Sequence, residues 1–86
     1  MNHKAHPDFW FHYRHLPEQV QRLADKNFEL LKSNPRHPSL QLKKVGHDLY
    51  SARVGLDYRA LAFDLGEHLV WFWIGQHDEY DHLLSR

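Results

Sequence analysis

The 86-residue sequence contains no cysteine and no long apolar run. Without cysteine the chain has neither disulfides nor thiolate ligands for a metal ion. Small secreted domains often depend on disulfides, so their absence favours a reducing compartment. No apolar stretch approaches the roughly 18 residues that a membrane span needs, and the polar start of the chain lacks the apolar segment of a signal peptide. We therefore expect a cytoplasmic protein that does not contact a membrane.

The sequence also lacks an excess of charge of either sign, since eleven Lys and Arg residues balance eleven Asp and Glu residues. Nucleic-acid-binding proteins are usually strongly basic because they neutralise phosphates. Neutrality therefore argues against a large nucleic-acid interface but remains compatible with a local basic cluster. The nine histidines make the net charge less certain, because small pKa shifts would charge several of them near neutral pH.

Apolar residues, by contrast, are abundant: 42% of the chain is hydrophobic and 14% is aromatic. A chain of this length forms one domain with a thin core, to which large aromatic side chains contribute much buried area. We expect a single domain over residues 1–86, in which the polar residues 1–7 are flexible. Residues 8–14 are compatible with either a short strand or a helical turn.

The hydrophobic pattern predicts a helix over residues 17–33, where apolar residues recur at helical spacing up to a stop at Asn34-Pro35. Short apolar segments separated by turns then predict strands, and the last is apolar on both faces: residues 40–45, 49–54, 58–63 and 69–74. Within that last strand Trp71 and Trp73 are two residues apart, so we expect them to share a face and to belong to the core.

Residues 77–84 are compatible with a short terminal helix. Short connections between the predicted strands favour antiparallel pairing. The predicted fold class is therefore α+β: an N-terminal helix, or a helical hairpin, packs on one face of a three- or four-stranded, mainly antiparallel sheet that is followed by a short C-terminal helix.

Arg53 and Arg59 are candidates for a phosphate site on the sheet face that the helix leaves uncovered. If they flank an odd-length loop centred on Leu56, they stand opposite each other on one face. A two-residue turn would instead send them to opposite faces. Guanidinium groups suit phosphate because they offer a planar, permanently charged fork. The structural alternative is that each arginine pairs with a nearby acid, Asp57 or Asp64.

Lys43 and Lys44 face opposite ways if they lie in a strand, so one of them can reach the same surface as the arginines. The alternative is that they keep an edge strand soluble. His77 and Tyr80 follow the last strand and are plausible general acid–base groups, which share a helix face with Asp81. The alternative there is a capped helix whose Tyr80 packs on the core.

The sequence has neither a metal-binding His motif nor a glycine-rich phosphate loop, so we expect no metal and no cofactor. Its segments do match, in order and spacing, a pattern found in one superfamily of small proteins: residues 9–17, 28–32, 34–40, 43–45, 50–55, 57–61 and 73–80. With these segments the chain resembles RelE/ParE superfamily toxins of type II toxin–antitoxin systems, over residues 8–84.

The resemblance implies a bacterial α+β toxin that a cognate antitoxin holds inactive. Most RelE-like toxins cleave mRNA, usually on the ribosome and without a metal. The positions that match their catalytic residues are Arg53, Arg59, His77 and Tyr80, with Lys43 and Lys44 as further RNA-binding residues. ParE-like members share the fold but inhibit DNA gyrase.

Two features of the sequence differ from the pattern of ribosome-dependent toxins. The net charge is zero, and acids lie beside the expected site at Asp78, Glu79 and Asp81. Three functions therefore stay open. We expect an mRNA endoribonuclease that arrests translation and binds mRNA, and with it the ribosome. The alternatives are a gyrase inhibitor without nuclease activity, and an inactive module that only binds the antitoxin.

Overall fold

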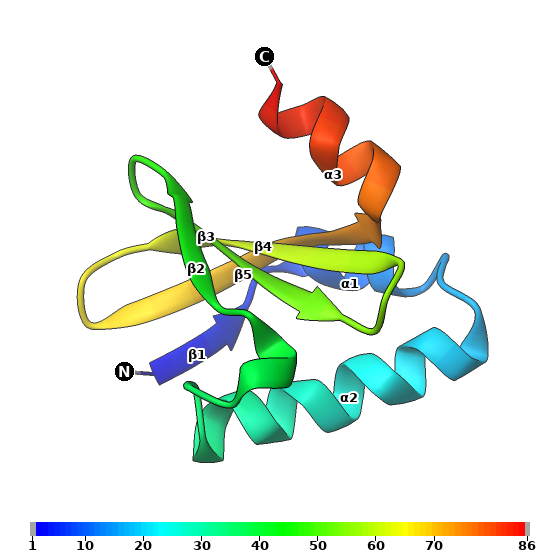
Figure 1. The fold of residues 1–86 in the computed structure, drawn as a ribbon, viewed down its shortest axis with the longest axis horizontal. Coiled ribbons are helices and arrows are strands. Elements are labelled where there is room, and N and C mark those ends of the chain that lie inside the picture. The colour runs from blue at the N-terminus through cyan, green and yellow to red at the C-terminus, as the bar shows by residue number, and fades with distance from the viewer. Residues whose placement is uncertain (1, 86) are drawn as a thin grey trace.

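The computed structural model describes residues 2–85, which form a five-stranded sheet and three α-helices (Figure 1). The elements, in chain order, are β1 (Asn2–Ala5), α1 (Pro7–Tyr13), α2 (Glu18–Ser33), the 3-10 turn η1 (Pro38–Leu40), β2 (Lys43–Gly46), β3 (Leu49–Val54), β4 (Tyr58–Asp64), β5 (His68–Gln76) and α3 (His77–Leu84). The strand order is β1-β5-β4-β3-β2, with β1 parallel to β5 and the other pairs antiparallel. The α+β class is as predicted, with more strands than the expected three or four.

The two N-terminal helices enclose the main hydrophobic core together with one face of the sheet. Apolar residues recur every three or four positions along α2, so a single stripe of the helix faces the sheet. Ala24 and Leu31 are buried in this stripe, while Leu23 and Phe28 are partly buried against the core. The helix confirms the prediction for residues 17–33 to within one residue. Among the described residues no helix is long and apolar enough to cross a membrane.

The segment that was ambiguous in the sequence, residues 8–14, is helical up to Tyr13 and forms most of α1. Pro7 occupies the first turn, where its missing N–H costs nothing, and the Nδ1 atom of His6 accepts a hydrogen bond from the Asp8 N–H at 3.0 Å. Phe9 is buried in the same core as α2. The helical layer therefore contains two helices rather than one.

The central strands β3, β4 and β5, and the helix α3, match the predicted segments to within two residues at each end. The strand predicted over residues 40–45 is different, because it begins only at Lys43. The preceding residues form the turn η1, and Gln41 adopts a left-handed conformation with φ of 44°, which interrupts the extended chain.

Strand β1 was not predicted. We expected residues 1–7 to be flexible; Met1 lies outside the described residues, but Asn2–Ala5 pair with His68–Trp71 of β5. The indole Nε1 of Trp71 also donates a hydrogen bond to Nδ1 of His3 at 3.2 Å. The prediction of a flexible terminus is therefore wrong for residues 2–5, because pairing with a distant strand orders this polar segment.

A β-bulge in β5 corrects the prediction for the two tryptophans. Leu61 pairs with Trp73 while the next residue, Ala62, pairs with Trp71, so Phe72 is the extra residue of the bulge. Because a bulge inserts one extra residue, residues two positions apart across it point to opposite faces of the sheet. Trp71 therefore packs in the main core with the helices, and Trp73 packs on the opposite face of the sheet.

Candidate functional site

The sheet face opposite α1 and α2, which we call the open face, carries the short helix α3 and no other helix of residues 2–85. Figure 1 shows α2 and α3 on opposite sides of the sheet. Tyr80 of α3 packs on Leu61 and Trp73 in a small second core. The helix is fixed at its first residue as well, because the His77 N–H donates to the Asp57 carbonyl at 2.8 Å. These two contacts fix α3 against the open face.

Arg53 and Arg59 are paired directly across β3 and β4. The connection is the odd-length alternative, a loop centred on Leu56, in which Gly55 has a φ of +67°. Their chain neighbours Ala52 and Ala60 are buried in the main core. Because side chains alternate along a strand, both guanidinium groups project onto the open face.

Neither arginine is neutralised by an acid. Among residues 2–85 no salt bridge involves Arg53 or Arg59, so pairing with Asp57 or Asp64 is not found. The Nε atoms of both arginines are buried and have no hydrogen-bond partner in the described part of the chain. The one side-chain hydrogen bond described for this pair is weak, from Nη1 of Arg59 to Oε1 of Gln41 at 3.5 Å. Two permanent cations with unused donors therefore lie side by side.

Tyr80 lies against this pair and is itself held firmly. Its ring centroid is 5.7 Å from Cζ of Arg59, within the range of a cation–π contact. Its side chain is only 6% exposed, and its hydroxyl donates to Oγ of the buried Ser51 at 3.2 Å. The tyrosine therefore packs on the core, as the alternative interpretation of this residue proposed, while it also contacts a candidate site residue.

His77 also lies near the Tyr80 ring, with 5.7 Å between the two ring centroids. Its Nδ1 atom is 3.0 Å from Oδ2 of Asp81, one helical turn later. The histidine side chain remains 40% exposed. A carboxylate on Nδ1 orients an imidazole and favours the tautomer whose Nε2 atom accepts protons.

The two lysines differ in position. Lys43 pairs with Ser51, whose side chain faces Tyr80, so Lys43 belongs to the open face. Lys44 pairs with Tyr50, which packs in the main core, so it belongs to the opposite face at the sheet edge. Both side chains are exposed. Only Lys43 therefore shares a face with the arginine pair.

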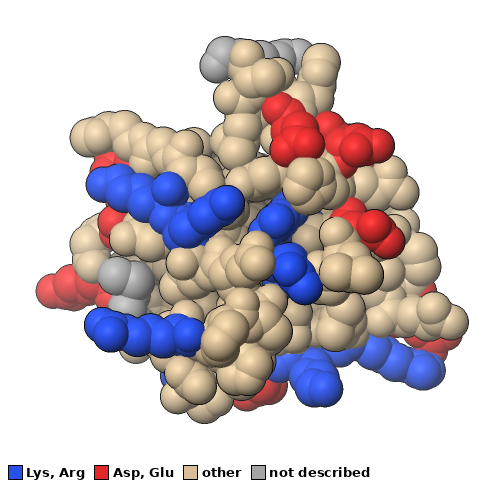
Figure 2. Space-filling view, in the orientation of Figure 1, with Lys and Arg blue, Asp and Glu red and all other residues tan. Residues whose placement is uncertain are grey.

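The surface near the arginine pair carries basic side chains, and α3 carries acidic ones. Figure 2 shows Lys and Arg side chains over the strands and also over α2, and acidic side chains over α3 and at other places on the surface. The acids on α3 are Asp78, Glu79 and Asp81, all of them exposed. Within residues 2–85 there is no cluster of three or more His, Asp or Glu side chains that could hold a metal ion.

Sequence reasoning missed two supporting residues. Ser51 is fully buried and accepts the Tyr80 hydrogen bond; a lone serine in an apolar strand is the only signal for it. Gly75 pairs with Arg59, and a Cβ atom there would be 2.6 Å from the Trp73 ring. The absence of a side chain at Gly75 therefore lets the indole lie flat on the sheet beside the arginine.

The family model of the ParE-like toxin domain matches residues 18–82. No curated protein sequence matches the chain. Solved structures with this fold include the RelB–RelE antitoxin–toxin complex from Methanococcus jannaschii, with 22% identity, a TM-score of 0.71 and coverage of 92% of this chain and 96% of that chain. The RelE–RelB complex from Pyrococcus horikoshii OT3 has 21% identity, a TM-score of 0.67 and coverage of 87% and 92%.

The isolated RelE toxin of E. coli is more distant in sequence, at 16% identity, but covers 99% of this chain and 96% of its own, with a TM-score of 0.63. At these identities the solved structures establish the fold alone. The family model spans most of the chain and includes every candidate site residue. The protein therefore belongs to the ParE-like toxin domain family of the RelE/ParE superfamily.

Proposed function

We propose that this protein is the toxin of a type II toxin–antitoxin module and that it arrests translation by cleaving mRNA without a metal ion. The observation that carries the proposal is the arginine pair. Arg53 and Arg59 face each other on the open face, and their buried Nε atoms have no partner. Two like charges that face each other without an acidic partner within residues 2–85 are costly, so their retention favours a role in binding an anion.

The arginine pair would hold the phosphate at the cleavage point. Cleavage that uses the 2′-oxygen as nucleophile passes through a phosphorane with added negative charge, which fixed cations stabilise. Arg59 is further positioned by the ring of Tyr80 and by Gln41. Lys43, one cross-strand row away on the same face, is suited to a neighbouring phosphate.

His77 is the residue best suited to move a proton. With a proton on the Nδ1 atom that faces Asp81, its Nε2 atom is free to accept the proton of the 2′-hydroxyl. Tyr80 was expected to stack on a base or to transfer a proton. Its burial and its hydrogen bond to Ser51 favour a positioning role, in which the ring contacts both Arg59 and His77.

The partner that would restrain this activity is a cognate antitoxin. Two solved structures with this fold are complexes of RelE with RelB antitoxins. We propose that an antitoxin likewise binds this chain, in the cytoplasm, and covers the open face or the helical face. Co-expression with the neighbouring gene should then abolish toxicity; harmless expression of the toxin gene alone in a bacterial host would contradict the proposal.

The direct test combines growth arrest, ribosome toeprinting and thermal unfolding for Arg59→Ala and His77→Ala. Loss of a positioned acid or base lowers a rate by about 10²–10⁴-fold, and loss of a charge-stabilising donor by about 10²–10³-fold. We expect both variants to lose mRNA cleavage while they remain folded. Folded and fully toxic variants would refute the nuclease assignment.

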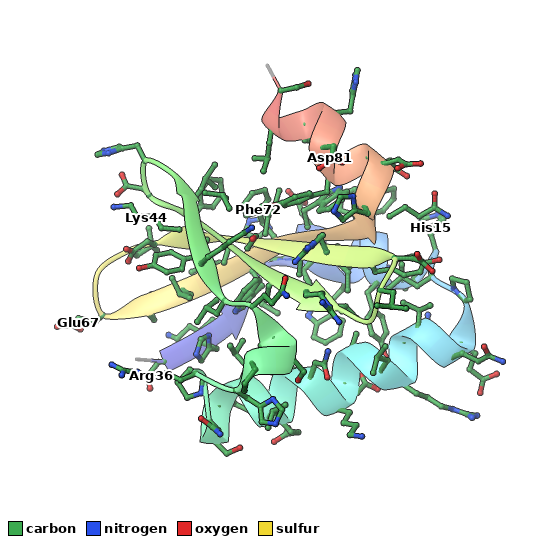
Figure 3. The ribbon with its side chains drawn as sticks, viewed as in Figure 1. His15, Arg36, Lys44, Glu67, Phe72 and Asp81 are labelled. Carbon is green, nitrogen blue, oxygen red and sulfur yellow. The ribbon has the colours of Figure 1, made fainter. Side chains whose placement is uncertain are left out.

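Matched controls are available for both substitutions. His47 is also ion-paired with an aspartate, at 3.2 Å from Asp48, but its side chain is 93% exposed in the β2–β3 turn. Arg36 is exposed in the loop before β2, away from α3 (Figure 3). His47→Ala and Arg36→Ala should therefore leave both toxicity and cleavage unchanged.

Gyrase inhibition is the second candidate, and a specific observation favours it. The three exposed acids of α3 border the site, and the net charge is zero, which is unusual for a protein that engages the ribosome. A supercoiling assay with purified gyrase separates the two functions. Inhibition of supercoiling without mRNA cleavage would favour gyrase as the target, and the reverse result would support the nuclease.

A further inference from the structure

Two phenylalanines form an exposed aromatic stack that belongs to neither hydrophobic core in full. The rings of Phe63 on β4 and Phe72 on β5 are nearly parallel, with an interplanar angle of 17° and 4.1 Å between centroids. Phe63 is 47% exposed, whereas Phe72 is partly buried against the second core. One ring is therefore anchored by packing and supports another that is open to solvent.

The bulge in β5 is what brings these rings together. Because Phe72 is the extra residue between Trp71 and Trp73, it turns to the open face next to Trp73 instead of into the main core. Figure 3 shows Phe72 on the side of the sheet that carries α3. Bulges often redirect a side chain next to a functional site. An ordinary strand at this position would leave Phe63 without its stacking partner.

The stack lies in line with the phosphate-binding arginines. Arg59, Leu61 and Phe63 alternate along β4 and therefore share the open face. Phe63 is four positions after Arg59 along the strand, a distance of about 13 Å. Lys43 belongs to the row between them, through its pairing with Ser51 and the pairing of Ser51 with Leu61. The arginine pair, Lys43 and the exposed Phe63 ring therefore share the open face, and on β4 the buried Leu61 lies between Arg59 and Phe63.

We propose that Phe63, supported by Phe72, is a stacking platform for a base of single-stranded RNA whose backbone is held by Arg59 and Lys43. The proposal rests on the proposed function and adds a subsite to it. A cationic track with an aromatic ring beside it is the arrangement that binds single strands, and stacking tolerates any base because every base has a π face. The base is not that of the cleavage point, because Phe63 lies several residues away from Arg59.

The experiment measures the affinity of a short oligoadenosine that is methylated at every 2′-oxygen, and so cannot be cleaved, by fluorescence anisotropy. Phe63→Leu keeps an apolar side chain but removes the ring, and it should weaken binding by about 5- to 100-fold. Phe63→Tyr keeps the ring and should bind like the unchanged protein. Phe11→Leu is the matched control, since Phe11 is 57% exposed but belongs to α1.

An abasic scan then identifies stacking directly. Oligonucleotides that each lack one base should bind the unchanged protein more weakly at one particular position. The Phe63→Leu variant should show no further loss at that position, because the ring and the base contribute a single interaction. The proposal would be overturned, even if Phe63→Leu weakened binding, by either of two results: no single missing base lowers the affinity of the unchanged protein more than the others, or the same missing base lowers the affinity of both proteins equally.

Failure of this inference can be distinguished from failure of the proposed function. If Arg59→Ala weakens oligonucleotide binding and Phe63→Leu does not, the stacking subsite is refuted and the phosphate site stands. If the unchanged protein and Arg59→Ala both fail to bind the oligonucleotide, the proposed function is refuted, and the stacking subsite with it. If Phe63→Leu loses antitoxin binding but retains RNA affinity, the aromatic pair is a protein interface and the inference is overturned.

Discussion

Replacing Arg59 with methionine should stabilise the folded protein while it removes the phosphate site. The reason is that Arg59 is poorly satisfied in the folded state: its Nε atom is buried without a partner, and it faces a second arginine, Arg53, across the strand pair. Methionine has a stem of similar length that preserves much of the packing but carries neither a donor nor a charge.

The magnitude follows from opposing contributions. A buried polar group without a partner costs about 1–3 kcal/mol, and like charges placed directly opposite on a sheet cost up to about 1 kcal/mol. The substitution loses the cation–π contact with Tyr80, which contributes about 0.5–1 kcal/mol. Because Arg59 is only partly buried, we take the lower end and expect a gain of about 1 kcal/mol. In a domain of this size that raises Tm by about 4–8 °C.

Thermal and urea unfolding of the unchanged protein, Arg59→Met and the control Arg36→Met test this prediction. The control should stay within about 0.5 kcal/mol, as surface substitutions usually do. Added inorganic phosphate should raise Tm of the unchanged protein and have less effect on Arg59→Met, because a ligand stabilises the state that binds it. A loss of stability in Arg59→Met would show that the guanidinium is a structural group and would remove the main support for the phosphate site.

Two further predictions concern the frame around the site. Gly55→Ala should lower the free energy of unfolding in urea by about 2 kcal/mol, because a side chain is strained at φ of +67° and its Cβ atom would be 2.8 Å from Leu23. The loss should be smaller in a Leu23→Ala background. If the two substitutions lower the free energy of unfolding additively, the predicted contact is contradicted. Burial lowers the pKa of His3 below its ordinary value of about 6.5, and only the neutral ring accepts the Trp71 hydrogen bond. The unfolded state then binds the proton first, so stability should fall as pH drops from about 7 to about 5; His3→Asn should reduce this slope, and unchanged slopes would refute the prediction.

The parts of the fold that the sequence predicts are those specified by local patterns. Helix α2 has a continuous apolar stripe with stop signals after it, and β3, β4 and β5 are apolar segments between turns. Strand β1 has no such pattern, because Asn2–Ala5 is short and polar and is ordered by pairing with residues more than sixty positions away. The bulge at Phe72 likewise depends on register with β4, which alternation within a single strand does not reveal.

The candidate site was only partly predictable for the same reason. The sequence allows two loop geometries between Arg53 and Arg59, one that places them on the same face and one that places them on opposite faces. The structure has the first, in which Gly55 adopts a left-handed conformation. The contact of Tyr80 with Ser51 joins residues 29 positions apart, so it requires the tertiary structure. The residue types of the site are therefore readable in the sequence, whereas their mutual orientation is not.

The neutral net charge is compatible with a phosphate site because of how the charges are distributed. Two other cations of the chain form local ion pairs on α2, Arg22 with Glu18 and Lys32 with Glu29. The arginines of the open face have no such partners among the described residues, so their field is not cancelled nearby. Three exposed acids, Asp78, Glu79 and Asp81, lie on α3 (Figure 2). These acids would repel an RNA backbone from α3, whereas the arginine pair and Lys43 would attract it to the part of the open face that α3 leaves uncovered.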